Sequence, residues 1–283
     1  MKNAFGNKIP EIKTILKNGN VKKYIETTLK EVLTYLEIKE IKELVDFAIN
    51  NASTYQDISD YEKKVHLMFD KKRVTQRIPV KLSNRAQLMF NQIKNHVKGR
   101  DVLDLGCGDG KVGEILQDIH GRDVILVDVY EHGNISNINL PFGLIKQNKK
   151  IPFLDSSFDT TLLLTVLHHS DDPVQVLEEA RRVTKKGGRV LIIESVYGVE
   201  AYGALSEEEQ RLANIFFDHF YNRIIHYSDF EENKVNVPFN FQTPQNWNTL
   251  FKKEGFSVVN TIELGFDQKT VPEFHTLHVL EVA

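Results

Sequence analysis

The sequence Asp101-Val-Leu-Asp-Leu-Gly-Cys-Gly-Asp-Gly-Lys-Val-Gly113 joins a short apolar run to three glycines that alternate with other residues. It predicts a buried strand from Val102 to Leu105, a tight loop, and a helix from about Lys111 to Ile119. Glycines let the loop backbone take positive φ and let a ligand lie against it. The first helical turn presents free N–H groups and the positive end of its dipole to the same place. We therefore predict that this loop binds a ligand.

The loop departs from the dinucleotide fingerprint GxGxxG, because Lys111 stands where that pattern has its third glycine. The third glycine allows close packing of the helix on the strand in NAD-binding folds. The sequence therefore argues against a nicotinamide-dependent dehydrogenase.

The same stretch resembles motif I of the class I S-adenosylmethionine-dependent methyltransferases, in the form (V/I)LD(L/I)GCGxG. The resemblance implies S-adenosylmethionine as the cofactor and S-adenosylhomocysteine as the product. It implies that the cofactor-binding residues of this loop are Asp104, Gly106, Cys107, Gly108, Asp109 and Gly110. Cys107 is interpreted as a small residue that fills a tight turn rather than as a reactive thiol.

A second strand, Asp123 to Asp128, ends in a carboxylate. A carboxylate at this strand end can accept two hydrogen bonds from a ribose diol, as it does for adenosine-containing cofactors in such folds. We predict that role for Asp128, although a strand-end Asp also often caps a helix. Val129 would then pack on the adenine.

The third strand is expected from Gly143 to Gln147, followed by Ile151-Pro-Phe-Leu-Asp-Ser-Ser-Phe-Asp159. This region is similar to the family segment DAxxLPFxDxSFD, whose first Asp accepts the adenine amino group. Here Gln147 and Asn148 take that place, which is a departure. An amide oxygen can still accept from the amino group, so both remain candidates for adenine binding.

The block from Phe158 to Glu194 predicts a buried strand that ends at the His168-His169 pair, and then a helix to about Val183. Gly187-Gly188 is expected to end that helix in a left-handed conformation and to start strand five. The block is similar to the corresponding part of many small-molecule methyltransferases, which implies that Thr165 lies beside the methionine part of the cofactor.

His168 and His169 have two interpretations. In the first, one of them serves as a general base, because a histidine at a strand end can face the transferred methyl group. Alternatively, each is a structural histidine that is hydrogen-bonded within the loop. After this strand the chain reads Thr165-Val-Leu-His, without the (D/N)PP(Y/F) motif of enzymes that methylate adenine amines or glutamine amides.

Val196 to Phe241 form an insertion after strand five, and its centre, Ser206 to His226, predicts a helix that opens with a capping box. In this fold such an insertion commonly caps the acceptor pocket. The expected acceptor contacts are Phe216, Phe217, Phe220, Tyr221, Arg223 and His226. His219 is a further candidate base, and no metal site is expected.

The rest of the chain completes a seven-stranded Rossmann-like α/β domain, whose last strand is antiparallel. Thr243 and Pro244 begin a helix, and strands are expected at Ser257 to Leu264 and Phe274 to Val282. The resemblance covers residues 100–283, and we place the methyltransferase domain at 83–283. Residues 1–82 are predicted to be an all-α extension. The helical pattern continues to residue 97, and its last helix is expected to be capped by Ser83 or Asn84 and to run to His96. An alternative role for these helices is a homo-oligomer surface.

Charge is distributed unevenly along the chain. Residues 1–100 hold 20 Lys/Arg and 11 Asp/Glu, whereas 101–283 hold 16 and 28. Residues 71–100 contain nine cations and no acid. This segment either attracts RNA or an acidic substrate, or it neutralises the acidic half.

Several classes of protein are disfavoured by composition. No apolar run of about 18 residues and no apolar leader are present, so we expect neither a membrane span nor secretion. A single cysteine excludes a disulfide framework and arsenic methylation and fits a cytoplasmic location. We therefore expect methyl transfer to a small molecule, at a hydroxyl or carboxyl oxygen. The alternatives are a methyltransferase that acts on RNA or protein, guided by residues 71–100, and a cofactor-binding regulator without turnover.

Overall fold

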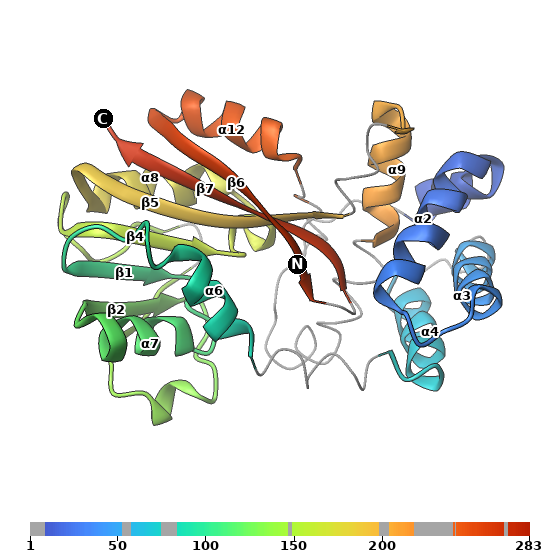
Figure 1. The fold of residues 1–283 in the computed structure, drawn as a ribbon, viewed down its shortest axis with the longest axis horizontal. Coiled ribbons are helices and arrows are strands. Elements are labelled where there is room, and N and C mark those ends of the chain that lie inside the picture. Colours follow the sequence, from blue (N-terminus) through green and yellow to red (C-terminus); the bar gives the residue numbers. More distant parts are fainter. Residues whose placement is uncertain are drawn as a thin grey trace. The chain divides into compact units, whose positions relative to one another are not determined.

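The computed structural model describes residues 9–52, 58–74, 84–146, 149–197, 204–217, 240, 242–268 and 271–283. The chain forms two compact units (Figure 1). The sheet unit consists of Asn84–Ser195, Gln242–Gly265 and His275–Ala283, and the helical unit consists of Met1–Ser83, Val196–Phe241 and Phe266–Phe274.

A seven-stranded sheet forms the centre of the sheet unit, in the order β3-β2-β1-β4-β5-β7-β6. The strands are β1 (Asp101–Leu105), β2 (Asp123–Asp128), β3 (Phe142–Leu144), β4 (Phe158–Leu164), β5 (Thr184–Tyr197), β6 (Phe256–Gln268) and β7 (Val271–Val282). Strands β1 to β5 pair in parallel. Only two residues join β6 to its neighbour β7, so these two strands form an antiparallel hairpin. The expected seven-stranded fold with an antiparallel last strand is confirmed.

Helices cover both faces of the sheet. Successive strand residues point to opposite faces, so neighbours along one strand belong to different cores. Val102 belongs to the core formed with α6 (Arg85–Ile93) and α7 (Lys111–His120). Leu103 belongs to the core formed with α8 (Pro173–Val183) and α12 (Pro244–Lys253). Figure 1 shows α6 and α7 in front of the sheet and α8 behind it.

Helix starts follow the predicted capping chemistry in part. The Thr243 hydroxyl accepts from the Asn246 N–H at 3.2 Å and Pro244 opens α12, as predicted. Asn84 occupies the N-cap of α6, but its side chain makes no capping hydrogen bond, and the helix ends at Ile93 rather than His96.

Three predicted boundaries are corrected. Strand β3 ends at Leu144, and β4 ends at Leu164 before a short 3-10 helix, η3 (Leu167–His169). The Gly187-Gly188 pair lies inside β5 and not at the end of α8. Phe158 pairs with Thr184 and Thr160 pairs with Arg189, so residues 185–188 bulge out of the strand, with Gly187 at φ 71°.

The helical unit contains α1 (Ile9–Thr14), η1 (Ile15–Lys17), α2 (Gly19–Val32), α3 (Ile38–Asn51), α4 (Ile58–Lys71) and α9 (Glu207–Phe217). Helix α9 comes from the insertion, yet its apolar residues share one core with the N-terminal helices. The Ser206 N–H donates to the Glu209 carboxylate at 2.9 Å, and the Glu209 N–H donates to the Ser206 hydroxyl at 3.4 Å, which together form the predicted capping box. Glu209 also accepts from Asn18, and Arg211 forms an ion pair with Glu11. The N-terminal segment and the insertion therefore form one structural unit.

Arg182 on α8 fixes the segment that precedes β4. Its guanidinium donates to both carboxylate oxygens of Glu179, at 2.9 and 2.7 Å, and to Asp155 at 2.8 Å. It also donates to the carbonyl oxygens of Ile151 and Phe153, at 3.1 and 2.8 Å. Since the Arg182 side chain is 16% exposed, its hydrogen bonds to Glu179 and to the two carbonyls are largely shielded from water, whereas Asp155 is exposed.

We expect Arg182→Ala to lower the free energy of unfolding by about 2–4 kcal/mol, because Glu179 loses its cation and keeps only the Ile151 N–H, and two carbonyls lose their donor. The neighbouring Arg181→Ala, at an exposed position, should change it by less than about 1 kcal/mol. Urea denaturation of the two variants measures the difference. Equal losses would contradict the role given to Arg182.

Candidate active site

The glycine loop between β1 and α7 has the predicted backbone conformation. Gly106, Gly108 and Gly110 have φ of 79°, 54° and 74°. The N–H groups of Gly106 and Cys107 donate to the Val127 carbonyl at 2.7 and 3.1 Å, which joins the loop to the end of β2. The loop therefore lies at the carboxyl edge of the parallel strands, where α/β folds bind their ligands.

The three glycines are required for different reasons. A Cβ on Gly106 would lie 2.5 Å from Val166, and one on Gly110 would lie 2.8 Å from Ile138. These two glycines therefore allow close packing within the protein. A Cβ on Gly108 would meet nothing within 4 Å. Gly108 is consequently the place where a ligand can approach the backbone.

Asp128, at the end of β2, is buried beside this loop. Its carboxylate accepts from the N–H of Gly108 at 2.8 Å and from the N–H of Val129 at 2.6 Å. Burial raises the pKa of Asp128, and these backbone donors partly offset the increase. The carboxylate thus links the strand end to the loop and retains lone pairs for a ribose diol.

Asp104, at the end of β1, is also buried, and its Oδ2 has no hydrogen-bond partner. Burial, followed by the charges of Asp128 and Asp109, raises the pKa of Asp104 to about 7. Its side chain lies on the α7 side of the sheet, where Gly113 permits close approach of the helix. A buried carboxylate with a free oxygen and acidic neighbours is suited to a cationic ligand.

These residues fit S-adenosylmethionine, which carries a sulfonium and an ammonium group. Two apolar side chains beside Asp128 fit its adenine: Val129 is 50% exposed, and Leu144, which pairs with Asp128 across β2 and β3, is 62% exposed. Burial raises the pKa of the Cys107 thiol, in line with a space-filling role for this residue.

The turn after β4 borders the same loop, since Val166 is the side chain that a Cβ on Gly106 would meet. Thr165 has φ 60°, a strained value for this residue, and its N–H donates to the Ile193 carbonyl at 2.7 Å. His169 is partly exposed, and its ring centroid lies 4.1 Å from that of His168. Thr165 and His169 are thus brought to the carboxyl edge of the sheet.

His168 occupies a structural position. It is 3% exposed, and its Nδ1 lies 2.6 Å from Oε2 of Glu194, in the carboxyl-terminal part of β5. Of the two interpretations of His168, this geometry favours the hydrogen-bonded structural histidine over the base. Glu194 was not predicted as a site residue. Its position could have indicated it, because this carboxylate directly follows the apolar run Val190 to Ile193.

The predicted acceptor contacts are only partly described. Phe217 requires a correction: it is fully buried in the helical unit, edge-to-face with Tyr24 and Phe216, so it is a core residue and not an acceptor contact. Phe216 is buried in the same core. The other predicted residues, Gln147, Asn148, His219, Phe220, Tyr221, Arg223 and His226, lie outside the described residues.

The basic segment 71–100 is paired with acids at several points. Lys72 contacts Glu40 and Glu43 at 3.1 and 3.4 Å. Arg100 contacts Asp123 at 2.7 Å. Of these pairs, Arg100–Asp123 joins the segment to the acidic half and supports neutralisation there, whereas the partners of Lys72 belong to residues 1–100.

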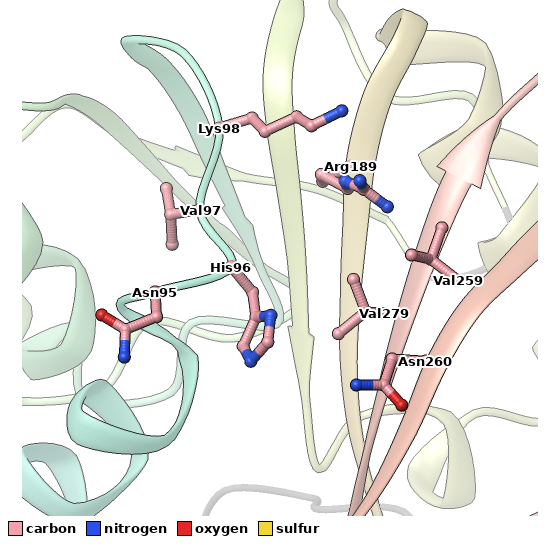
Figure 2. Close-up of a pocket in the computed structure, with 8 residues that line it drawn as sticks. All are labelled: Asn95, His96, Val97, Lys98, Arg189, Val259, Asn260 and Val279. Carbon is pink, nitrogen blue, oxygen red and sulfur yellow. The ribbon is translucent and has the colours of Figure 1, made fainter.

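A cavity of about 240 Å³ lies between residues 95–98 and strands β5, β6 and β7 (Figure 2). It is lined in part by Lys98 and Arg189, and both contact Glu281, at 3.0 and 3.3 Å. Lys98 precedes β1 and Arg189 pairs with Thr160 near the start of β4. The cavity is therefore at the amino edge of the parallel strands, opposite the glycine loop, and its cations are already paired.

Two further properties concern the described residues alone. None of their helices combines the length and apolar character needed to cross a bilayer. Within the same ranges, no three His, Cys, Asp or Glu side chains are grouped so that they could hold a metal ion.

Comparison with known proteins gives matches to methyltransferases. Residues 103–192 match the family model described as a methyltransferase domain. A tRNA U34 carboxymethyltransferase from Nautilia profundicola is 29% identical over 149 residues, which are 47% of this chain and 48% of that protein. A ubiquinone biosynthesis O-methyltransferase from Paraburkholderia phymatum is 26% identical over 132 residues, 44% of this chain and 56% of that protein. The chain thus spans about half the length of these curated relatives.

A solved structure from Pyrococcus horikoshii has the same fold. It superposes with a TM-score of 0.51 at 21% identity and covers 71% of this chain and 91% of that one.

The glycine assignments make a testable distinction. Gly108→Ala and Gly121→Ala both place a Cβ in open space at positive φ, so each should lower the free energy of unfolding by only about 1 kcal/mol. Only Gly108→Ala should weaken S-adenosylhomocysteine binding, by about tenfold or more, because its methyl group occupies the ligand's side of the loop. Calorimetric titration measures both affinities. Unchanged binding by Gly108→Ala would show that the ligand lies elsewhere.

Asp104 makes a second prediction, on pH. Because its folded-state pKa is raised to about 7, the folded protein keeps a proton that the unfolded chain releases near pH 4, and stability is lost as pH rises through this window. Asp104→Asn removes that loss. The free energy of unfolding of the variant minus that of the wild type should increase by about 1 kcal/mol per pH unit between pH 5 and 7 and then level off. Urea denaturation across this range measures the difference, and a gap that does not depend on pH would contradict the burial argument.

Proposed function

We propose that this chain, which carries a class I S-adenosylmethionine-dependent methyltransferase domain, transfers a methyl group to a hydroxyl or carboxyl oxygen of a small molecule. The observation that carries this proposal is the convergence of two buried carboxylates, an open glycine and a partly exposed histidine at one edge of the sheet.

The binding roles follow from the contacts. Asp128 accepts the ribose hydroxyls while it keeps the Gly108 N–H, and Val129 packs on the adenine. Asp104 faces the positive charge of the cofactor. Asp109, whose charge contributes to the raised pKa of Asp104, adds to the same negative potential.

Bound S-adenosylmethionine supplies an activated methyl group, so the protein must align the acceptor and, for a hydroxyl, remove its proton. We assign proton removal to His169, which is partly exposed in the turn after β4. His168 holds that turn from inside and is not needed as a base. Thr165 lies at the start of the same turn and contributes to the methionine end of the site.

The candidate contacts of the acceptor are Phe220, Tyr221, Arg223 and His226, with His219 as a second base, all of them in the insertion. Aromatic side chains with a few isolated polar groups suit a small organic acceptor.

RNA is the second candidate substrate, because one relative is a tRNA U34 carboxymethyltransferase. The ion pairs of Lys72 and Arg100 speak against a large free basic surface in the described part of residues 71–100. An RNA substrate would show a steep decrease in affinity with added salt, whereas a small acceptor would show a shallow one.

Calorimetry on the wild type and on Asp128→Ala tests the cofactor assignment. We expect the wild type to bind S-adenosylmethionine and S-adenosylhomocysteine, and Asp128→Ala to bind both at least about tenfold more weakly, because it loses the ribose acceptor and the Gly108 contact. Asp123→Ala is the matched control, since Asp123 is the exposed acid at the other end of β2. NAD serves as the control ligand.

Turnover then tests the chemistry. With an acceptor found by screening phenols, carboxylic acids and tRNA, we expect His169→Gln to lower kcat by about 10²–10⁴-fold with cofactor affinity retained. Preference for NAD would refute the cofactor assignment. Cofactor binding without turnover of any acceptor would favour the regulator.

A further inference from the structure

The carboxylate of Glu194 lies at the junction of β5 and the turn after β4, and its side chain is 1% exposed. One oxygen accepts from the N–H groups of Val166 and Leu167, at 3.1 and 2.7 Å. The other oxygen contacts Nδ1 of His168 at 2.6 Å. A single side chain thus satisfies three donors of a turn that has left the sheet ladder.

The turn needs such support, because its first residue is strained. Thr165 at φ 60° is held by the Ile193 carbonyl, so consecutive residues of β5 fix the two sides of the turn. A buried N–H of Val166 or Leu167 without an acceptor would cost enough free energy to open this conformation.

The same turn forms part of the cofactor site. Val166 approaches Gly106 so closely that no Cβ fits between them, and the ring of His169 lies against that of His168. A displacement of the turn therefore reaches both the glycine loop and the candidate base.

We infer that Glu194 is a positioning residue of the methyltransferase site. Its carboxylate holds the turn Thr165 to His169 against the glycine loop, and it fixes the tautomer of His168 that carries the proton on Nδ1, because a carboxylate only accepts hydrogen bonds. This inference rests on the proposed function for its effect on cofactor binding, whereas the tautomer is a property of the protein alone.

Glu194→Gln tests the inference with little change of shape. The amide can still accept from the two backbone N–H groups, but its NH₂ then faces Nδ1 of His168. We expect the ring proton to move to Nε2, visible in ¹⁵N spectra of the histidine rings. S-adenosylhomocysteine should bind about tenfold more weakly, a change of about 1.4 kcal/mol.

Asp159 provides a matched control at the other end of β4. Its carboxylate also accepts from two backbone N–H groups, those of Arg100 and Asp101 at 2.7 and 3.0 Å, and contacts one cation, Lys185, at 2.8 Å. Asp159→Asn should lower the melting temperature, as Glu194→Gln does, but leave S-adenosylhomocysteine affinity within about twofold of the wild type.

The outcomes separate the inference from the proposed function. Failure of the wild type to bind S-adenosylhomocysteine would refute the proposed function. Wild-type binding with equal affinities for Glu194→Gln and Asp159→Asn would overturn the positioning role and leave only a structural one. The wild-type spectrum needs no variant: a His168 ring without a proton on Nδ1 would overturn the inference even if Glu194→Gln failed to fold.

Discussion

The hydrogen bond from the Gly108 N–H to the Asp128 carboxylate is the contact on which the rest of the site depends. It joins the end of β2 to the loop between β1 and α7, and it holds the one glycine of that loop that faces open space. The N–H favours the ionised form of the carboxyl group, whereas burial opposes its ionisation and raises the pKa of Asp128. Asp104 is in the same situation on the neighbouring strand, with a pKa near 7. The protein therefore maintains two unfavourable buried carboxylates, which a cationic cofactor would stabilise.

The acidic side chains at the two edges of the sheet have different partners. At the amino edge, Asp101 and Asp159 share Lys185, at 2.8 Å each. At the carboxyl edge, Asp104 and Asp128 form no ion pair with any lysine or arginine that the structure describes. Glu194 is closer to the amino-edge arrangement, because His168 and two backbone donors satisfy it. Asp104 and Asp128 are thus the buried acids left for a cationic ligand, whereas the paired acids hold the strands together at the amino edge and keep the turn after β4 in place.

Local sequence signals predicted the sheet unit well. Alternation of apolar residues, the glycine loop and the Thr243-Pro244 start gave the strands and helices, because each depends on neighbours along the chain. Gly187 shows what such signals cannot predict. Its positive φ was expected, but at the end of α8, whereas it lies in a bulge of β5 that depends on pairing with β4. The cofactor side of the site followed from resemblance, whereas the roles of His168 and Glu194 required the contact between two strands. Phe217 was misassigned for the same reason, since an aromatic helix face looks alike whether it covers a pocket or a core.

The shared core of the helical unit has a consequence for how the chain is made. Buried residues of α2 and α3 meet those of α9, and β1 to β5 are encoded between them. At typical rates of synthesis, α9 leaves the ribosome on the order of ten seconds after α3. During that interval the first helices have only each other to cover their apolar faces, while the residues of the sheet emerge. We therefore expect the nascent chain to pass through a state in which the N-terminal helices have formed without α9 and still expose apolar side chains. The chain should depend on chaperones at that stage.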